Sequence, residues 1–299
     1  MRLVTFSAGG AIRIGVVEDD GVVDLTTAAP ELPREMSAFL AAGVPAIAAA
    51  RAAAQGRSAR LPLASVRLRA PVLRPPKFLA IGLNYADHVA ETNAKRPEFP
   101  IFFNKQSTCV IGPGEPIHRP RVSALLDYEG ELGFVIGRRC RHVPKERAAE
   151  VIAGYLVVND VTVRDWQFKA PTMTLGKSFD THGPIGPWIV TPDAVGDPHA
   201  LELKTWVNGE LRQHSNTREL IFDCFDQVAT LSTSFTLEPG DIVTTGTPSG
   251  VGIMQQKWLV PGDVVRVEIE RIGTLENPVV EEPADTATLD ASRETGGPR

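Results

Sequence analysis

Residues 127–137 constrain the fold more than any other stretch, because they join two glutamates to an apolar run. The run at 132–136 contains aliphatic and aromatic residues and ends at a glycine, which predicts a buried strand. Since side chains alternate across a strand, we expect Glu129 and Glu131 on one face. Two neighbouring carboxylates repel each other and lose solvation on burial, so a hard divalent cation would suit them.

A third acidic residue interrupts a second β-rich run, at residues 157–163. Asp160 stands in its middle, and an aspartate inside an apolar strand is costly unless it is paired or bound to a metal. Three carboxylates without cysteine or histidine suit Mg²⁺, Mn²⁺ or Ca²⁺ rather than zinc. The alternative is that the two glutamates lie on a solvated face or form ion pairs with lysine and arginine.

The composition is that of an ordinary globular protein. The chain has 299 residues, of which 43% are hydrophobic and 22% charged, so a large domain with a small one and a sizeable core are expected. The net charge of -5 gives no reason to expect nucleic acid or a membrane as partner. No apolar run is long enough to span a bilayer, and the N-terminus lacks a signal-peptide core. The three cysteines are widely spaced and odd in number, which predicts reduced thiols and a cytoplasmic location.

The first 70 residues predict a small N-terminal domain. Three short strands joined by glycine-containing turns are expected at 3–7, 12–18 and 21–25. An alanine-rich helix is expected at 36–55, with Gly43 and Pro45 able to break it and Gly56 ending it. The basic, proline-containing residues 57–77 are interpreted as a connector to the main domain.

The main domain is expected at residues 71–280. Its remaining predicted strands are 78–82, 101–103, 201–207 and 264–269, and its predicted helices are 86–93, 145–153 and 219–230. A glycine-rich loop follows another strand near residue 244, and its N–H groups could hold a carboxylate or phosphate. Residues 281–299 contain one strongly apolar residue, Leu289, and are predicted to form a disordered tail.

Several side chains of the main domain are candidates for catalysis or binding. His88 and Glu91 lie three residues apart on one predicted helix, where a histidine held by a carboxylate is the usual general-base arrangement. An ordinary exposed His–Glu pair is the alternative. Lys105 could contact an anion or be a plain surface lysine. Arg164 could bind a carboxylate in a planar fork or pair with Asp165.

Four motifs, taken in order, resemble the fumarylacetoacetate hydrolase family, from about residue 71 to residue 280. They are GLNYADH at 82–88, DYEGEL at 127–132, NDVTVRD at 159–165 and TGTP at 245–248. The resemblance is to the acylpyruvase and 2-hydroxyhepta-2,4-diene-1,7-dioate isomerase-like branch. It implies an α+β fold, in which a mixed β-roll or sandwich carries a few helices and a small N-terminal α+β domain precedes it. It also implies a homodimer.

The resemblance also implies roles for individual residues. Glu129, Glu131 and Asp160 fall on metal-ligand positions for Mg²⁺ or Mn²⁺. The implied catalytic residues are His88, Glu91 and Lys177, with the His–Glu pair on a lid segment. Lys177, Gln167 and Thr247 match positions that contact the oxo-acid end of the substrate, and Tyr85, Lys105 and Arg164 are further candidate substrate-binding residues. One departure is Leu83, because some acylpyruvase-like members carry arginine there.

The implied activity is a divalent-metal-dependent hydrolysis of a 2,4-dioxo acid. His88 would activate a water that attacks the C4 carbonyl, Lys177 would stabilise the oxyanion, and the C3–C4 bond would break to give pyruvate and a carboxylic acid. Decarboxylation, isomerisation or hydration of a related 2-oxo acid would use the same enolate chemistry. A non-catalytic binding module on the same scaffold is the alternative from a different class.

Overall fold

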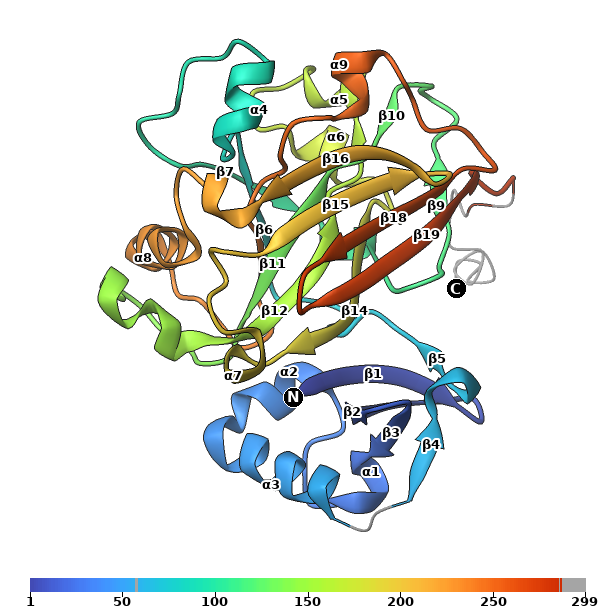
Figure 1. The fold of residues 1–299 in the computed structure, drawn as a ribbon, viewed down its shortest axis with the longest axis vertical. Helices are drawn as coiled ribbons and strands as arrows, with labels where there is room; N and C mark the ends of the chain where they lie inside the picture. The colour runs from blue at the N-terminus through green and yellow to red at the C-terminus, as the bar shows by residue number, and fades with distance from the viewer. Residues whose placement is uncertain (57–58, 285, 287–299) are drawn as a thin grey trace, which may run out of the picture.

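The structure of the protein is a computed structural model that describes residues 1–56, 59–284 and 286. Within this part, one sheet of twelve strands runs through both the N-terminal segment and the remainder of the chain. Figure 1 shows the N-terminal strands at one end of the molecule. Its strands are β1 (Arg2–Ala8), β2 (Ala11–Glu18), β3 (Gly21–Asp24), β4 (Arg60–Pro62), β5 (Arg67–Leu68), β6 (Phe78–Gly82), β7 (Ile101–Lys105), β8 (Val110–Ile111), β11 (Gly130–Ile136), β12 (Ile152–Asn159), β14 (Gly183–Val190) and β17 (Ile242–Thr244). The main path has the order β4-β3-β2-β1-β14-β12-β11-β17-β6-β7, with β5 on β1 and β8 on β14.

The N-terminal segment contains the three predicted strands and the predicted helix break. Its helices are α1 (Leu25–Ala28), α2 (Met36–Ala41) and α3 (Gly43–Gln55). Gly43 has a φ of +68°, so the chain turns at this residue between α2 and α3. Residues 57–77 are more than the connector that the sequence suggested, since β4 pairs with β3 and β5 pairs with β1.

The N-terminal segment shares its sheet and its core with the rest of the protein. Leu3 in β1 pairs with Ile189 in β14. One buried cluster contains Leu3 and Phe39 from the N-terminal segment together with Leu156 and Ile189 from the main part. The two parts are therefore continuous through one sheet and one buried cluster. The division into residues 1–70 and 71–280 as domains stays a prediction.

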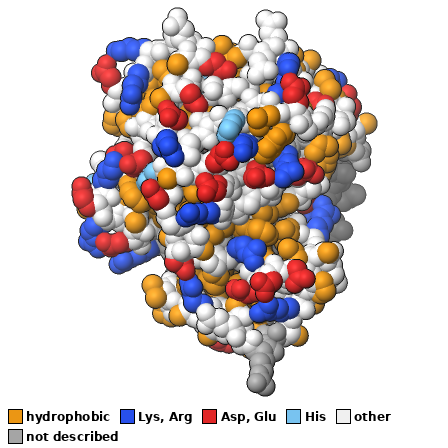
Figure 2. All heavy atoms as spheres, viewed as in Figure 1, with side chains coloured by type: hydrophobic (Ala, Val, Ile, Leu, Met, Phe, Trp, Pro, Cys, Tyr) orange, Lys and Arg blue, Asp and Glu red, His pale blue; other side chains and the backbone are white. Residues whose placement is uncertain are grey.

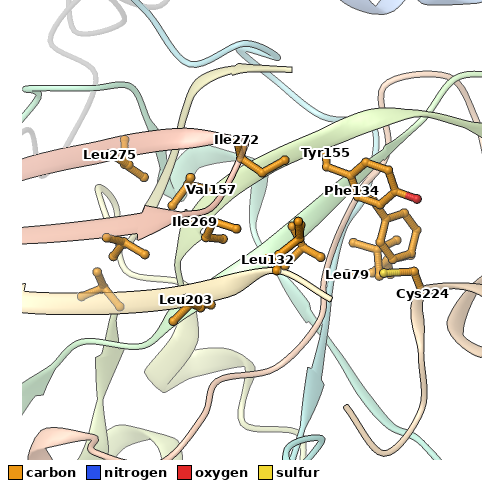
Figure 3. Packing of buried hydrophobic residues seen from close by; sticks show 14 of the residues in the cluster. Leu79, Leu132, Phe134, Tyr155, Val157, Leu203, Cys224, Ile269, Ile272 and Leu275 are labelled. Carbon is orange, nitrogen blue, oxygen red and sulfur yellow. The ribbon is translucent and has the colours of Figure 1, made fainter. Parts of the chain in front are cut away.

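A second sheet packs across the large one. It has the order β16-β15-β18-β19-β9. Its strands are β9 (Ile117–Arg119), β15 (Glu202–Val207), β16 (Glu210–Asn216), β18 (Val264–Ile269) and β19 (Gly273–Glu281). Figure 3 shows side chains of both sheets in one core, including Leu132 and Val157 from the large sheet and Leu203, Ile269 and Leu275 from the smaller one. Burial of these apolar faces is the main stabilising contribution to the sandwich.

The remaining elements are short and lie around the sandwich. A two-stranded ladder pairs β10 (Leu126–Asp127) with β13 (Thr162–Val163). The helices are α4 (Ala86–Glu91), α5 (Arg164–Gln167), α6 (Thr174–Lys177), α7 (Pro192–Val195), α8 (Cys224–Ser234) and α9 (Gly252–Gln255). The 3₁₀ turns are η1 (Leu63–Ser65), η2 (Ser107–Cys109), η3 (Lys145–Val151) and η4 (Thr217–Glu219).

Four sequence-based boundaries differ from the structure. The helix predicted at 219–230 begins at Cys224, because the Asp223 carboxylate caps it by accepting from the N–H groups of Phe225 and Asp226. Of the helix predicted at 145–153, residues 145–151 form the 3₁₀ turn η3, and residues 152 and 153 begin β12. Asp160 lies just beyond β12 and not in mid-strand.

The fourth boundary concerns the predicted tail. Glu281 belongs to β19 and pairs with Arg119 in β9, so the ordered chain continues past residue 280. Most of the predicted tail, 285 and 287–299, lies outside the described residues.

No helix in the described part is long and apolar enough to cross a membrane. On the face shown in Figure 2, acidic and basic side chains are interspersed.

Candidate active site

Three buried carboxylates meet where β11 and β12 lie side by side. Gly130 pairs with Asn159 across these strands, so the adjoining residues Glu129 and Asp160 lie next to each other. The N–H of Asp160 donates to the Glu129 carbonyl at 2.8 Å. Glu131 follows on β11, and one oxygen from each of the three carboxylates lies within 4.8 Å of the others. The structure therefore brings together the three acidic residues that the sequence singled out.

Three buried cations surround two of these carboxylates. The Lys177 Nζ lies 2.6 Å from Glu129 and 2.8 Å from Asp160, and the Lys105 Nζ lies 2.6 Å from Asp160. Arg164 lies 2.7 Å from the other oxygen of Glu129. Burial alone would raise the pKa of Glu129, but Lys177 and Arg164 outweigh it and hold the pKa at about 2. Glu129 is therefore ionised at neutral pH.

Glu131 has a different environment. No lysine or arginine of the described chain forms an ion pair with it, and its Oε2 accepts from the Thr244 hydroxyl and, at 2.7 Å, from the Gly246 N–H. Burial, followed by the charges of Asp160 and Glu129, raises its pKa well above the ordinary value. A buried carboxylate beside two others is stabilised best by a further cation. The donor set, three carboxylates without a soft ligand, fits a hard divalent ion such as Mg²⁺ or Mn²⁺.

The glycine-rich loop after β17 holds acidic side chains of the protein itself. The sequence suggested that its N–H groups could hold a carboxylate, and in the structure they bind the protein's own. The bonds are Gly246 to Glu131 at 2.7 Å, Gly250 to Glu91 at 2.9 Å, Gly252 to Asp127 at 2.8 Å and Ile253 to Asp127 at 2.9 Å. One loop therefore fixes a candidate metal ligand, the partner of His88 and the partner of Arg164.

His88 and Glu91 form the pair that the sequence predicted. They project from α4, and the His88 Nδ1 lies 3.1 Å from the Glu91 Oε2. Because an ionised carboxylate can only accept, this contact places the proton on Nδ1 and leaves Nε2 free to accept a proton. Glu91 thus fixes the orientation of the imidazole.

A cavity of about 110 Å³ has both His88 and Glu129 in its wall, whereas Glu91, Glu131 and Asp160 do not line it. Its polar lining consists of His88, Glu129, Arg164, Gln167, Lys177 and Thr247, and its apolar lining consists of Ile81, Gly82, Leu83, Ile101, Phe103 and Met173. This volume suits a small organic acid, since a single water molecule needs only about 10–15 Å³ of such space. A larger hollow of about 820 Å³, lined by residues of α3 and α7, lies away from this chemistry.

The polar residues of the wall also bind one another. The Gln167 side-chain oxygen accepts from Arg164 at 3.0 Å. The Thr247 hydroxyl donates to the Gly130 carbonyl at 3.0 Å and accepts from Gln213 at 2.8 Å. These bonds fix Gln167 and Thr247 in the cavity wall before any ligand is present.

Two predicted substrate contacts do not line this cavity. Lys105 is buried against Asp160, and its Nζ also donates to the Lys177 carbonyl. Tyr85 is fully buried, and its hydroxyl has no hydrogen-bond partner among the described residues.

Asp127 was not predicted as a functional residue, yet it fixes Arg164 through contacts of 2.7 and 2.8 Å. Its place as the first residue of the DYEGEL motif, two positions before Glu129, was the available signal.

Comparisons with known proteins identify the family of the chain. The family model described as fumarylacetoacetate (FAA) hydrolase C-terminal matches residues 77–280. The chain is 42% identical over 288 residues to a protein named oxaloacetate tautomerase fahd2, mitochondrial, of Xenopus laevis, covering 94% of this chain and 90% of that protein. That name places the frog protein in mitochondria, and a cytoplasmic location for this chain stays a prediction.

Two solved structures are similar over nearly the whole chain. Maleylpyruvate hydrolase from Sphingobium sp. SYK-6, in complex with manganese(II) and pyruvate, has a TM-score of 0.80 and 36% identity, covering 95% of this chain and 100% of that one. The 5-carboxymethyl-2-hydroxymuconate delta-isomerase from Mycobacterium smegmatis has a TM-score of 0.76 and 38% identity, covering 94% and 100%. The predicted mixed α+β fold is confirmed, and the chain belongs to the fumarylacetoacetate hydrolase family.

Proposed function

We propose that the protein is a divalent-metal-dependent enzyme that hydrolyses the C–C bond of a 2,4-dioxo acid. The observation that carries the proposal is the position of His88. This base, held by Glu91, lines the same small cavity as Glu129 and Lys177. A base, a buried cation and a candidate metal ligand therefore face one space in which a small oxo acid fits.

Several groups of the chain would bind the acid. Arg164 and Lys177 supply positive charge in the cavity wall, while Gln167 and Thr247 supply neutral hydrogen-bonding groups. Glu129, Glu131 and Asp160 would hold the divalent ion, which when bound would supply Lewis acidity toward the oxygens of the substrate. The Sphingobium enzyme, whose structure contains manganese and pyruvate, supports a divalent ion as the cofactor.

His88 would begin the reaction by accepting a proton from water on Nε2. The water oxygen forms a bond to C4 of the dioxo acid, and the positive charge of Lys177 stabilises the negative charge that develops. The C3–C4 bond then breaks, and its electron pair stays with C3. C3 takes a proton back from the His88 imidazolium, so the products are pyruvate and a carboxylic acid.

A second candidate is tautomerisation of oxaloacetate, which the name and the 42% identity of the Xenopus relative favour. This reaction moves a proton between C3 and the oxo oxygen. His88 could carry that proton, and no water is consumed. The isomerase from Mycobacterium smegmatis is a further relative whose reaction needs proton transfer without hydrolysis.

Product analysis separates these candidates. Purified protein with Mg²⁺ or Mn²⁺ is given a panel of acylpyruvates, and pyruvate and the free acid are measured. Oxaloacetate is followed in parallel by its enol absorbance and by CO₂ release. Pyruvate from an acylpyruvate, lost on chelation of the metal, is the expected result. If only oxaloacetate is turned over, the second candidate, tautomerisation, replaces hydrolysis as the proposed function. If neither the acylpyruvates nor oxaloacetate are turned over in a metal-dependent way, the proposal is contradicted.

A further inference from the structure

We propose that Asp87 is a positioning residue that fixes α4, and through it His88, at the cavity. The inference rests on the proposed role of His88 as a base. Asp87 does not line the cavity and has no part in the reaction derived above. Its two carboxylate oxygens instead join the start of α4 to the smaller sheet.

The position of α4 depends on contacts made by residues outside the helix. The helix has six residues, and only Val89 is buried. A helix of this length is marginal in isolation, so its placement depends on contacts outside the helix. Figure 1 shows it at the same end of the molecule as α5, α6 and α9.

Asp87 supplies the contact at the start of the helix. Its Oδ1 accepts from the His88 backbone N–H at 2.7 Å, which satisfies one of the unpaired donors of the first turn. Its Oδ2 accepts from the Ser215 hydroxyl at 2.6 Å. Ser215 belongs to β16, the edge strand of the smaller sheet. One side chain therefore connects the His88 backbone to a strand far away in the sequence.

Glu91 supplies the contact at the other end. Its Oε1 accepts from the Gly250 N–H at 2.9 Å, while its Oε2 orients the His88 ring. The two acids thus have separate tasks. Glu91 sets the orientation and tautomer of the imidazole, and Asp87 sets where the helix, and hence the imidazole, lies relative to Glu129 and Lys177. Loss of Asp87 leaves the His88–Glu91 pair intact but allows the pair to move as a unit.

The test uses the full chain and four variants: Asp87→Ala, Asp87→Asn, Ser215→Ala and the double variant Asp87→Ala/Ser215→Ala. Asp197→Ala is the matched control. The Asp197 carboxylate also accepts from a nearby backbone N–H, that of His199 at 2.9 Å, but Asp197 does not line the cavity. The measurements are kcat and KM, Mn²⁺ affinity by calorimetry, amide hydrogen exchange at residues 86–91 and the NMR signals of the His88 ring.

We expect Asp87→Ala to lower kcat by roughly 10-fold to 10²-fold, the range that a misplacement of about 1 Å can produce, with Mn²⁺ affinity unchanged. Exchange at 86–91 should accelerate and the His88 signals should shift. Asp87→Asn should restore most of the activity, because its amide oxygen can accept from His88 and its NH₂ group can donate to Ser215. Ser215→Ala should have a smaller effect, and the double variant should be no worse than Asp87→Ala.

The inference is overturned if Asp87→Ala has the same amide exchange rates at 86–91, the same His88 ring signals and the same kcat as the wild-type protein. If that variant loses its fold, Ser215→Ala decides the matter, since it removes only one bond and must still accelerate exchange at 86–91. If the wild-type protein turns over no 2-oxo acid, the proposed function fails, whereas the exchange and NMR measurements still test the positioning role.

Discussion

Two glutamates at this site have pKa values shifted in opposite directions, because their neighbours differ. Glu129 and Glu131 lie two positions apart and are both buried. Lys177 and Arg164 outweigh burial and lower the pKa of Glu129, whereas burial and two neighbouring carboxylates raise the pKa of Glu131. The sequence identified both glutamates as candidate ligands. It could not distinguish them, because Lys177 and Arg164 approach only in the folded chain.

Glu131→Gln tests the assignment of Glu131 as a metal ligand. The glutamine oxygen can still accept from Thr244 and Gly246, but the charge is gone. We expect Mn²⁺ affinity in calorimetry to fall at least about 10-fold, by analogy with losses of 10- to 100-fold at groups that support metal ligands. The melting temperature without metal should rise, because a buried repulsion is removed. The control is Glu98→Gln, at an exposed pair with Lys95. Unchanged Mn²⁺ affinity would contradict the assignment.

A buried histidine away from the carboxylates gives a pH-dependent prediction. The His182 Nε2–H donates to the His118 carbonyl at 2.8 Å, and burial lowers the pKa of His182 from 6.5 to about 3. The unfolded chain therefore binds this proton below about pH 6.5, while the folded chain does so only near pH 3. The contribution of neutral His182 to the free energy of unfolding is therefore fully present above pH 6.5, and it declines as the pH falls toward 3.

His182→Gln keeps a donor for the His118 carbonyl and removes the titration. Between pH 6.5 and 3, the free energy of unfolding of the wild type should fall relative to the variant by up to about 1.4 kcal/mol per pH unit. Urea unfolding of both proteins at several pH values measures this difference. Parallel pH profiles would show that His182 does not titrate as the structure requires.

At the scale of elements, local patterns predicted strands well and long-range contacts poorly. Alternation and turn residues predicted β1, β2 and β3 almost to the residue. The start of α8 was missed because the Asp223 cap was overlooked, although its signal is local. The role of the glycine-rich loop could not be read from the sequence. Its carboxylate partners, such as Glu91 and Asp127, come from distant parts of the chain.

Gly250→Ala tests whether this loop supports the base. Gly250 has a φ of +98°, and a Cβ there would lie 2.0 Å from the Arg212 carbonyl oxygen, so the loop would have to shift. Its bond to Glu91 would then be strained or lost. We expect a lower melting temperature and a fall in kcat. Gly262→Ala is the matched control, because Gly262 has the same φ of +98° but open space around its Cβ position.

The two glycine variants share the cost of a left-handed backbone, about 1–3 kcal/mol. Any additional loss in Gly250→Ala therefore reports the collision and the broken contact with Glu91. Equal melting temperatures and equal kcat values in the two variants would show that the loop does not position the pair.

At the scale of the whole molecule, the N-terminal segment shares the large sheet and a buried cluster with the rest of the chain. The sequence separated residues 1–70 by composition, because a change from strands to an alanine-rich helix and a basic stretch suggests a boundary. Composition could not show that β1 pairs with β14, or that Phe39 packs in the same cluster as Leu156. The homodimer suggested by the family resemblance stays a prediction at this scale.

Removal of residues 1–70 should therefore prevent stable folding. The truncated chain would expose one edge of β14 and the apolar surface that Leu3 and Phe39 cover. We expect it to lack a cooperative thermal transition in circular dichroism, and co-expression with a separate 1–70 fragment to restore one. A truncated chain that melts at the full-length temperature would show instead that the two segments are independent domains.

The central claim is that His88 is the base of a reaction on a 2-oxo acid. The most direct measurement is the steady-state hydrolysis of an acylpyruvate by His88→Ala with saturating metal. His214→Ala, at an exposed histidine paired with Glu202, is the control. We predict that His88→Ala lowers kcat by roughly 10²-fold or more, the usual contribution of a positioned base, with metal affinity and melting temperature nearly unchanged. Decarboxylation of oxaloacetate, which needs no activated water, should be affected less. Hydrolysis by His88→Ala at the wild-type rate would contradict the claim.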